Sequence, residues 1–189
     1  MWPILLCSVI SITIILERFY HFHSTKPKIS NLTTRVKTMI KEKKHTEALR
    51  LCEEESSPTA RLLAIGIHIR NKTLEEKDKI IKQAGSKIIR EKEKYLRGLA
   101  VIGNISPLLG LLGTVTGIIK AFIKIQELNG TVDSAVLAGG IWEALITTAA
   151  GLCVAIPTLV AYYYFEGKID TIASNLKDTN LDISELYGI

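Results

Sequence analysis

Hydrophobic and charged residues separate into long blocks along this chain. Three blocks carry almost no charge: residues 2–16, 98–119 and 134–165, the last of which contains a single acidic residue, Glu143. A helix needs about 20 mostly apolar residues to cross a bilayer, so the second and third blocks each predict a membrane span. The first block reaches only about 22 Å at about 1.5 Å per residue. We therefore expect its helix to continue past Glu17 and Arg18 to Phe19 and Tyr20, and we also expect residues to be missing upstream.

The segment between the first two spans is polar and predicts helices. Ser57 precedes Pro58, which suits an N-cap followed by a proline at the first helical position. Thr73 stands three residues before Glu76, the spacing of a capping box. Each pair therefore predicts the start of a helix.

No residue after Thr73 stops the second of these helices before the next span. We expect one continuous rod from Leu74 to about Ile125. Gly85, Gly98 and Pro107 are the points at which the rod can bend.

The distribution of lysine and arginine predicts the orientation. Of 24 such residues, 20 lie between Arg18 and Arg97, whereas the connector 126–134 has none. Because short loops rich in these residues stay in the cytoplasm, the N-terminus is expected outside and the C-terminus inside. The net charge of +5 follows from this topology. It does not predict nucleic-acid binding, since lysine and glutamate alternate without stacking aromatic residues beside them.

The fold class expected from these blocks is all-α, with three transmembrane helices and long cytoplasmic helical extensions. The expected order is transmembrane helix 1 at 1–22, a cytoplasmic helical domain at 23–98, transmembrane helix 2 at 99–125, a short periplasmic connector at 126–134, transmembrane helix 3 at 135–165 and a cytoplasmic C-terminal helix or tail at 166–189.

The residue types needed for catalysis or metal binding do not occur in suitable patterns. Cys7, Cys52 and Cys153 have neither metal-ligand nor disulfide spacing, and the polar segment contains no phosphate-binding loop. We expect no metal, no cofactor and no enzymatic activity.

Small residues recur every three or four positions in the second and third spans, which places them on one stripe of each helix. Such stripes let helix backbones approach closely in lipid. Three helices alone cannot bury both stripes and also enclose the polar side chains of these spans, Glu143, Thr114, Thr147 and Thr148. We therefore expect neighbouring copies, in a homo-oligomer with a polar central interface. The packing residues are Gly110, Gly113 and Gly117 in the second span and Gly140, Gly151 and Pro157 in the third.

Two long motifs resemble a known family. Residues 108–118 read LLGLLGTVTGI, and residues 140–152 read GIWEALITTAAGL, followed by AIP at 155–157. This pair is similar to the signature of the ExbB/TolQ/MotA proton-channel family. The three-span layout, with Glu17 and Arg18 closing the first span, is similar to its ExbB and TolQ branch.

The resemblance implies a subunit of a proton-driven motor in the bacterial inner membrane, in contact with membrane lipids. Such a subunit forms a ring of about five copies around the transmembrane helices of an ExbD-like or TolR-like partner with one span and a membrane aspartate. A TonB-like or TolA-like protein then carries the movement to the outer membrane, for nutrient import or for envelope maintenance.

The resemblance also assigns site residues. Thr114 and Thr148 match pore-lining threonines, Glu143 matches a membrane glutamate, and Thr147 adjoins them. Hydroxyl groups can both donate and accept hydrogen bonds, so we expect these threonines to hold a proton carrier without fixing its charge. Two interpretations of Glu143 stay open: a functional carboxyl within the span, favoured by the resemblance, or an ion pair with Lys120 at its outer edge.

Two other functions remain compatible with the sequence. A passive oligomeric scaffold could hold a partner's helices without passing ions, since no span contains an aspartate. A flagellar-stator-like subunit is the other alternative, and three spans with a short loop argue against it.

Overall fold

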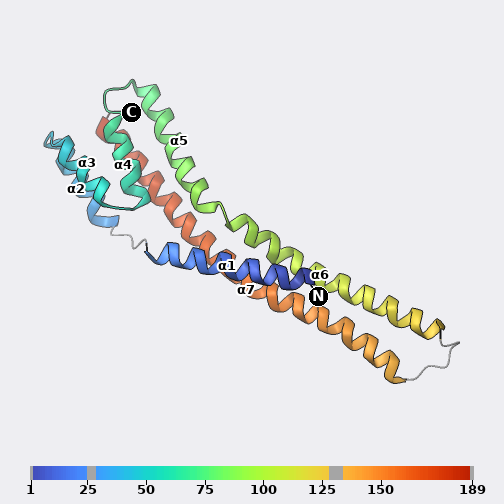
Figure 1. Cartoon of the computed structure of the whole chain (residues 1–189). Helices are drawn as coiled ribbons and strands as arrows, with labels where there is room; N and C mark the ends of the chain where they lie inside the picture. Colours follow the sequence, from blue (N-terminus) through green and yellow to red (C-terminus); the bar gives the residue numbers. More distant parts are fainter. Residues whose placement is uncertain (1, 25–28, 128–133, 188–189) are drawn as a thin grey trace. The chain divides into compact units, whose positions relative to one another are not determined.

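The structure, a computed structural model, describes residues 2–24, 29–127 and 134–187 (Figure 1). Within those residues the chain forms seven helices and no strand. They are α1 (Trp2–Ser24), α2 (Ile29–Lys41), α3 (His45–Glu54), α4 (Pro58–His68), α5 (Leu74–Glu93), α6 (Leu96–Glu127) and α7 (Ser134–Tyr187). The all-helical fold class is confirmed. Most of the expected connector, residues 128–133, lies outside the described residues.

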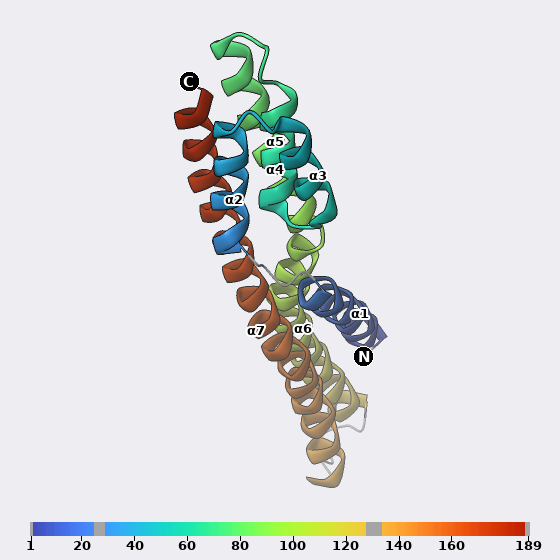
Figure 2. The same ribbon diagram turned by 90° about the vertical axis from the view of Figure 1, so that its left-hand side faces the viewer.

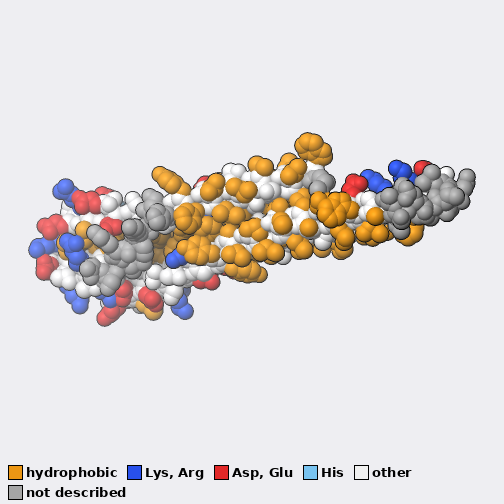
Figure 3. Space-filling view, turned by 90° about the horizontal axis from the view of Figure 1, so that it is seen from below, with side chains coloured by type: hydrophobic (Ala, Val, Ile, Leu, Met, Phe, Trp, Pro, Cys, Tyr) orange, Lys and Arg blue, Asp and Glu red, His pale blue; other side chains and the backbone are white. Residues whose placement is uncertain are grey.

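The chain divides into two compact units. Unit 1 comprises Met1–Arg18 and Tyr95–Phe165, and unit 2 comprises Phe19–Lys94 and Glu166–Ile189. Three helical segments among the described residues are long and apolar enough to cross a membrane, as the sequence predicted: they lie within α1, α6 and α7. Hydrophobic side chains cover much of the surface of these segments (Figure 3).

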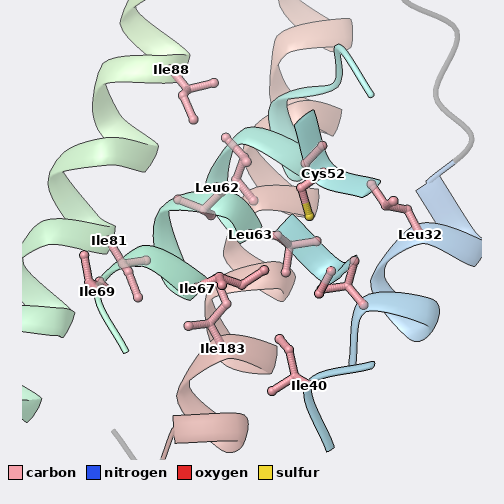
Figure 4. Close-up of a cluster of buried hydrophobic side chains, with 14 residues drawn as sticks. Leu32, Ile40, Cys52, Leu62, Leu63, Ile67, Ile69, Ile81, Ile88 and Ile183 are labelled. Atoms are coloured by element: carbon pink, nitrogen blue, oxygen red, sulfur yellow. The ribbon is translucent and has the colours of Figure 1, made fainter. Parts of the chain in front are cut away.

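Unit 2 has a hydrophobic core of its own, arranged around α4, which contacts α2, α3 and α5 (Figure 2). Leu62, Leu63 and Ile67 of α4 are almost fully buried and lie close to Ile81 of α5 and Ile183 of α7 (Figure 4). Burial of apolar side chains is the dominant favourable contribution to folding. The apolar residues of α2 to α5, together with Leu176 and Ile183 of α7, are therefore what holds this unit together.

Two ion pairs join helices at the surface of unit 2. Lys37 Nζ of α2 lies 2.5 Å from Asp182 Oδ1 of α7, and this hydrogen bond raises the pKa of Lys37. The guanidinium of Arg61 donates to Glu91 Oε2 at 2.7 Å and lowers the pKa of that carboxyl. Both pairs are partly exposed to solvent, so each contributes little to stability.

Cys52 of α3 belongs to the same core and is 3% exposed. Burial raises the pKa of its thiol to about 11, with a further contribution from the negative charge of Glu53. Cys52 is therefore protonated at neutral pH, as expected for a core residue.

Both predicted helix starts are confirmed. Ser57 Oγ accepts a hydrogen bond from the backbone N–H of Ala60 at 3.1 Å, with Pro58 at the first position of α4. Thr73 and Glu76 form the reciprocal hydrogen bonds of a capping box at the start of α5.

Replacing Ser57 with alanine should lower the stability of unit 2 by about 1 kcal/mol, because the buried N–H of Ala60 loses its acceptor. Thermal unfolding of the purified chain in detergent measures the effect. Ser57→Asp should retain most of the stability, since a carboxylate also caps. Equal unfolding temperatures for Ser57→Ala and the unmodified chain would show that this cap contributes nothing.

The predicted continuous rod is wrong at one point. Helix α5 ends at Glu93 and α6 begins at Leu96, so Lys94 and Tyr95 form a short turn between them. Gly85 lies within α5, and Gly98 and Pro107 lie within α6, and bending at these residues stays a prediction. The Tyr95 ring packs against Arg18 of α1, whose Cζ is 4.6 Å from the ring centroid. A cation–π contact between residues so far apart in sequence leaves no local signal for the turn.

Candidate functional site

The two stripes of small residues pack directly against each other within unit 1. A Cβ added at Gly151 of α7 would lie 2.6 Å from the carbonyl oxygen of Ser106, and one added at Gly117 of α6 would lie 2.9 Å from Ala144 Cβ. The contacts run in opposite directions along the two helices, so α6 and α7 are antiparallel neighbours (Figures 1 and 2). Glycine is needed there because any larger side chain would separate the backbones.

This pairing corrects one sequence interpretation. The stripes pack against each other in a single chain, so neighbouring copies are not needed to cover them, and that part of the argument is wrong. The homo-oligomer itself stays a prediction. Five of the predicted packing residues take part in the contact: Gly110, Gly113, Gly117, Gly140 and Gly151. Pro157 lies within α7 with its side chain exposed, and its packing role stays a prediction.

Threonine hydroxyls of α7 form hydrogen bonds to the backbone of α6 at the centre of this contact. Thr148 Oγ1 donates to the carbonyl oxygen of Gly110 at 3.0 Å. Thr147 Oγ1 donates to the carbonyl of Ala144 at 2.6 Å and also lies 3.5 Å from the same Gly110 oxygen. The missing side chain at Gly110 allows this approach, because a Cβ there would be 3.0 Å from Thr148 Cα.

Thr114 lies at the same level of the helix pair. It is one helical turn after Gly110, and the adjacent residue Gly113 faces Thr147. Its hydroxyl donates to the carbonyl of Leu111 at 2.7 Å. The structure thus places the three predicted threonines at one level along the helix pair, which we call the threonine level, with Thr147 buried and Thr114 and Thr148 half-buried.

All three threonine hydroxyls use their hydrogen in a bond to a backbone carbonyl oxygen. A carbonyl oxygen has no hydrogen, so each of these three hydroxyls must supply the hydrogen of its bond. These bonds do not test whether the hydroxyls also donate to a proton carrier, so that expectation stays a prediction. In these bonds, the lone pairs of the hydroxyl oxygens are what remains for a further hydrogen bond.

The structure does not bring Glu143 to the threonines. Glu143 is five residues before Thr148 on α7, about 140° around the helix, and its side chain is exposed. Lys120 is also exposed, and no ion pair is recorded between these two described residues. The role that the resemblance assigns to Glu143 therefore stays a prediction.

Two further buried polar groups of unit 1 were not predicted, and no contact of either with the three threonines is recorded among the described residues. Thr158 of α7 is 1% exposed and donates to the carbonyl of Val154, and a hydroxyl within an apolar run was its only signal. Arg18 is 3% exposed and lies 2.8 Å from Glu17 through its Nε. Its burial against Tyr95 could not be seen from the sequence. In the described part of the chain, no group of His, Cys, Asp or Glu could hold a metal ion.

The surface of unit 1 is strongly apolar around this site. Leu108 and Phe122 of α6 and Trp142 of α7 are more than half exposed in the single chain. Large exposed apolar side chains that lie close together mark surfaces that contact lipid or other proteins. The three threonines therefore form a short polar region within a helix pair whose remaining surface is mostly apolar.

Comparison with known proteins gives a consistent result. A family model described as the MotA/TolQ/ExbB proton channel family matches residues 54–178. The matched region includes all of α6, the threonine level and Glu143.

Individual relatives are named as ExbB proteins, one of the three protein types in that family description. The chain is 28% identical over 186 residues to the biopolymer transport protein exbB1 of Vibrio cholerae, covering 94% of this chain and 79% of that protein. It is 49% identical over 80 residues to ExbB of Salmonella typhimurium, covering 42% of this chain and 32% of the relative. The match to ExbB of Xanthomonas campestris is 41% identical over 111 residues, covering 53% and 42% respectively.

Proposed function

The chain belongs to the MotA/TolQ/ExbB proton channel family, on its ExbB-like branch, and from this premise we propose that it is the ring-forming subunit of a proton-driven motor in the bacterial inner membrane. It is a multi-pass membrane protein with three apolar spans. The observation that supports the proposal best is the threonine level, in which Thr147 and Thr148 approach the Gly110 carbonyl and Thr114 lies one turn along α6, inside the region that the family model matches.

The proton carrier in this proposal comes from another protein. The three apolar blocks contain no aspartate, and Glu143 lies on a different side of α7 from Thr148. A small partner of the ExbD or TolR type, with one span and a membrane aspartate, would supply the carboxyl. About five copies of the present chain would enclose the partner's helices, with the Thr114 and Thr148 hydroxyls facing inward.

The available driving force suits such a motor. One elementary charge that crosses about 150 mV gains about 3.5 kcal/mol. A conformational step of a few kcal/mol can be biased by that amount. The subunit itself would be non-enzymatic, and a TonB-like or TolA-like protein would transmit the movement, for nutrient import or for envelope maintenance.

The orientation of the chain in this proposal follows its charge. The 20 lysines and arginines between Arg18 and Arg97 would keep most of unit 2 in the cytoplasm. The N-terminus would face the periplasm, and the C-terminal end of α7 would lie in the cytoplasm.

A passive scaffold is the second candidate. It is favoured by the absence of an aspartate from the three apolar blocks and by the commitment of the threonine hydrogens to backbone carbonyls. A scaffold would hold the same partner helices and form the same ring. It would not conduct protons.

The proposal makes a direct prediction about assembly and conduction. Native mass measurement in detergent should give a ring of about five copies, and a co-expressed single-span partner of the ExbD or TolR type should co-purify with it. Liposomes that contain both proteins should take up protons when a potential is imposed. A partner with its membrane aspartate replaced by asparagine is the control and should bind without conducting. A stable monomer contradicts the ring, whereas a ring that never conducts supports the scaffold.

A further inference from the structure

The intramembrane hydroxyls of α6 and α7 share one hydrogen-bonding state. Thr114 donates to Leu111 O at 2.7 Å, and Thr148 donates to Gly110 O at 3.0 Å. Thr116 is within 3.0 Å and 3.1 Å of two backbone carbonyls of its own helix. Because a hydroxyl has one hydrogen and two lone pairs, each of these groups can only accept a further hydrogen bond.

Donation by threonine to its own helix is common, but the Thr148 bond is different. Most helical threonines donate to the carbonyl three or four residues earlier. Thr148 donates across the contact to α6, where the Gly110 carbonyl is reachable because glycine has no side chain. Turning this hydrogen toward an incoming group would break a bond that joins the two helices. The hydroxyl is therefore held as an acceptor.

We propose that the face formed by Thr114 and Thr148 binds a carboxyl group in its protonated, uncharged form and disfavours the carboxylate. This inference rests on the proposed function, in which a partner's carboxyl passes the threonine level. A protonated acid donates one hydrogen bond and matches a surface of lone pairs. A carboxylate has lone pairs only, so it would meet acceptor against acceptor in an apolar medium that already penalises charge.

The consequence for the motor concerns where the proton is exchanged. The carboxyl keeps its proton while it lies against Thr114 and Thr148. Uptake and release must then occur on either side of this level, where water or a donor group can stabilise the charged form. The threonine level would act as the neutral stretch of the pathway, which no unprotonated carrier crosses.

The inference can be tested in this chain without its partner. Leu145 is exposed and lies three residues before Thr148 on α7, so an acid placed there lies beside the Thr148 hydroxyl. The variant Leu145→Asp is reconstituted as the full chain in lipid bilayers. The infrared C=O stretch of the protonated acid then gives the pH at which half of the introduced carboxyl is protonated.

The direction in which Thr148→Val moves the protonation midpoint of the introduced carboxyl decides the result. Adding Thr148→Val to Leu145→Asp should lower the protonation midpoint by about one pH unit, a tenfold loss of proton affinity, because the acceptor for the acid's hydrogen is gone. A hydroxyl that donates to the carboxylate would give the opposite shift, a higher midpoint in the valine background. A higher or unchanged midpoint overturns the proposal. Thr148→Ser keeps the hydroxyl and should leave the midpoint unchanged.

A matched position controls for the bilayer itself. Val115 of α6 is also exposed, and its neighbours one turn away are apolar: Leu111, Leu112, Ile118 and Ile119. The midpoint of Val115→Asp should not respond to Thr148→Val. If Leu145→Asp does not fold, Leu152→Asp, four residues after Thr148, places the acid on the other side of the same hydroxyl.

Sodium gives a further check, because oxygen lone pairs also suit a metal cation. Titrations in sodium and in choline salts should give the same midpoint. A midpoint that falls in sodium would mean that the face binds a cation and would overturn the proposal. None of these outcomes depends on ring formation or on a partner, so failure here is distinct from failure of the proposed function.

Discussion

Replacing Gly151 with alanine is expected to separate α6 from α7 and to unfold unit 1 at a markedly lower temperature. The added methyl group would lie 2.6 Å from the backbone oxygen of Ser106 and 3.2 Å from Gly110 Cα, neither of which can rotate away. Forcing extra volume into a close contact costs about 1–3 kcal/mol and sometimes more. Thermal unfolding of the purified chain in detergent measures the loss, and Gly151→Leu should prevent folding altogether.

The same helix offers a matched control. Gly139 of α7 has no atom within 4 Å of the position where its methyl group would lie. Gly139→Ala should leave stability unchanged or raise it by up to about 1 kcal/mol, since alanine favours the helix. Equal unfolding temperatures for Gly151→Ala and Gly139→Ala would show that the helices do not approach as closely as described.

Valine at both Thr114 and Thr148 should abolish proton-driven work while the ring and its partner binding survive. Valine keeps the shape of threonine and removes the hydroxyl. The lost Thr148 bond to Gly110 should cost little, because interhelical hydrogen bonds in membranes contribute about 0.6 kcal/mol on average. That loss is too small to disassemble a ring. The double substitution nevertheless removes both hydroxyls that would face the carrier. Proton flux in liposomes that contain the partner measures the effect.

Thr116→Val is the control for this pair. Its hydroxyl is bonded within α6 and lies about 160° around the helix from Thr114. Flux should be normal in this variant. Full flux in the double valine variant would sink the motor mechanism, and loss of the ring in that variant would favour a scaffold.

The features that the sequence predicted correctly depend on neighbouring residues. Uncharged runs located the three spans because the length of a span follows from the bilayer. Ser57 was recognised as a cap from the proline that follows it, and Thr73 from the glutamate three residues later. The spacing of small residues likewise located the stripes of α6 and α7.

The features that it missed depend on residues far apart in the chain. The stripes could be found but not paired, so packing within one chain was mistaken for a need for neighbouring copies. The turn at Lys94 and Tyr95 involves Arg18, which has no local relation to it. The donor state of Thr148 depends on Gly110 of another helix, so only the folded pair reveals that its lone pairs face outward.

The burial of Cys52 makes the unmodified chain a ready background for site-directed probes. With a thiol pKa of about 11, on the order of one thiol in ten thousand is reactive thiolate at pH 7. Cys7 and Cys153 lie in apolar segments that water-soluble maleimides do not enter. A cysteine introduced at exposed Leu181 of unit 2 should therefore label alone. Spin labels or fluorophores can then follow the moving complex without prior removal of the natural cysteines.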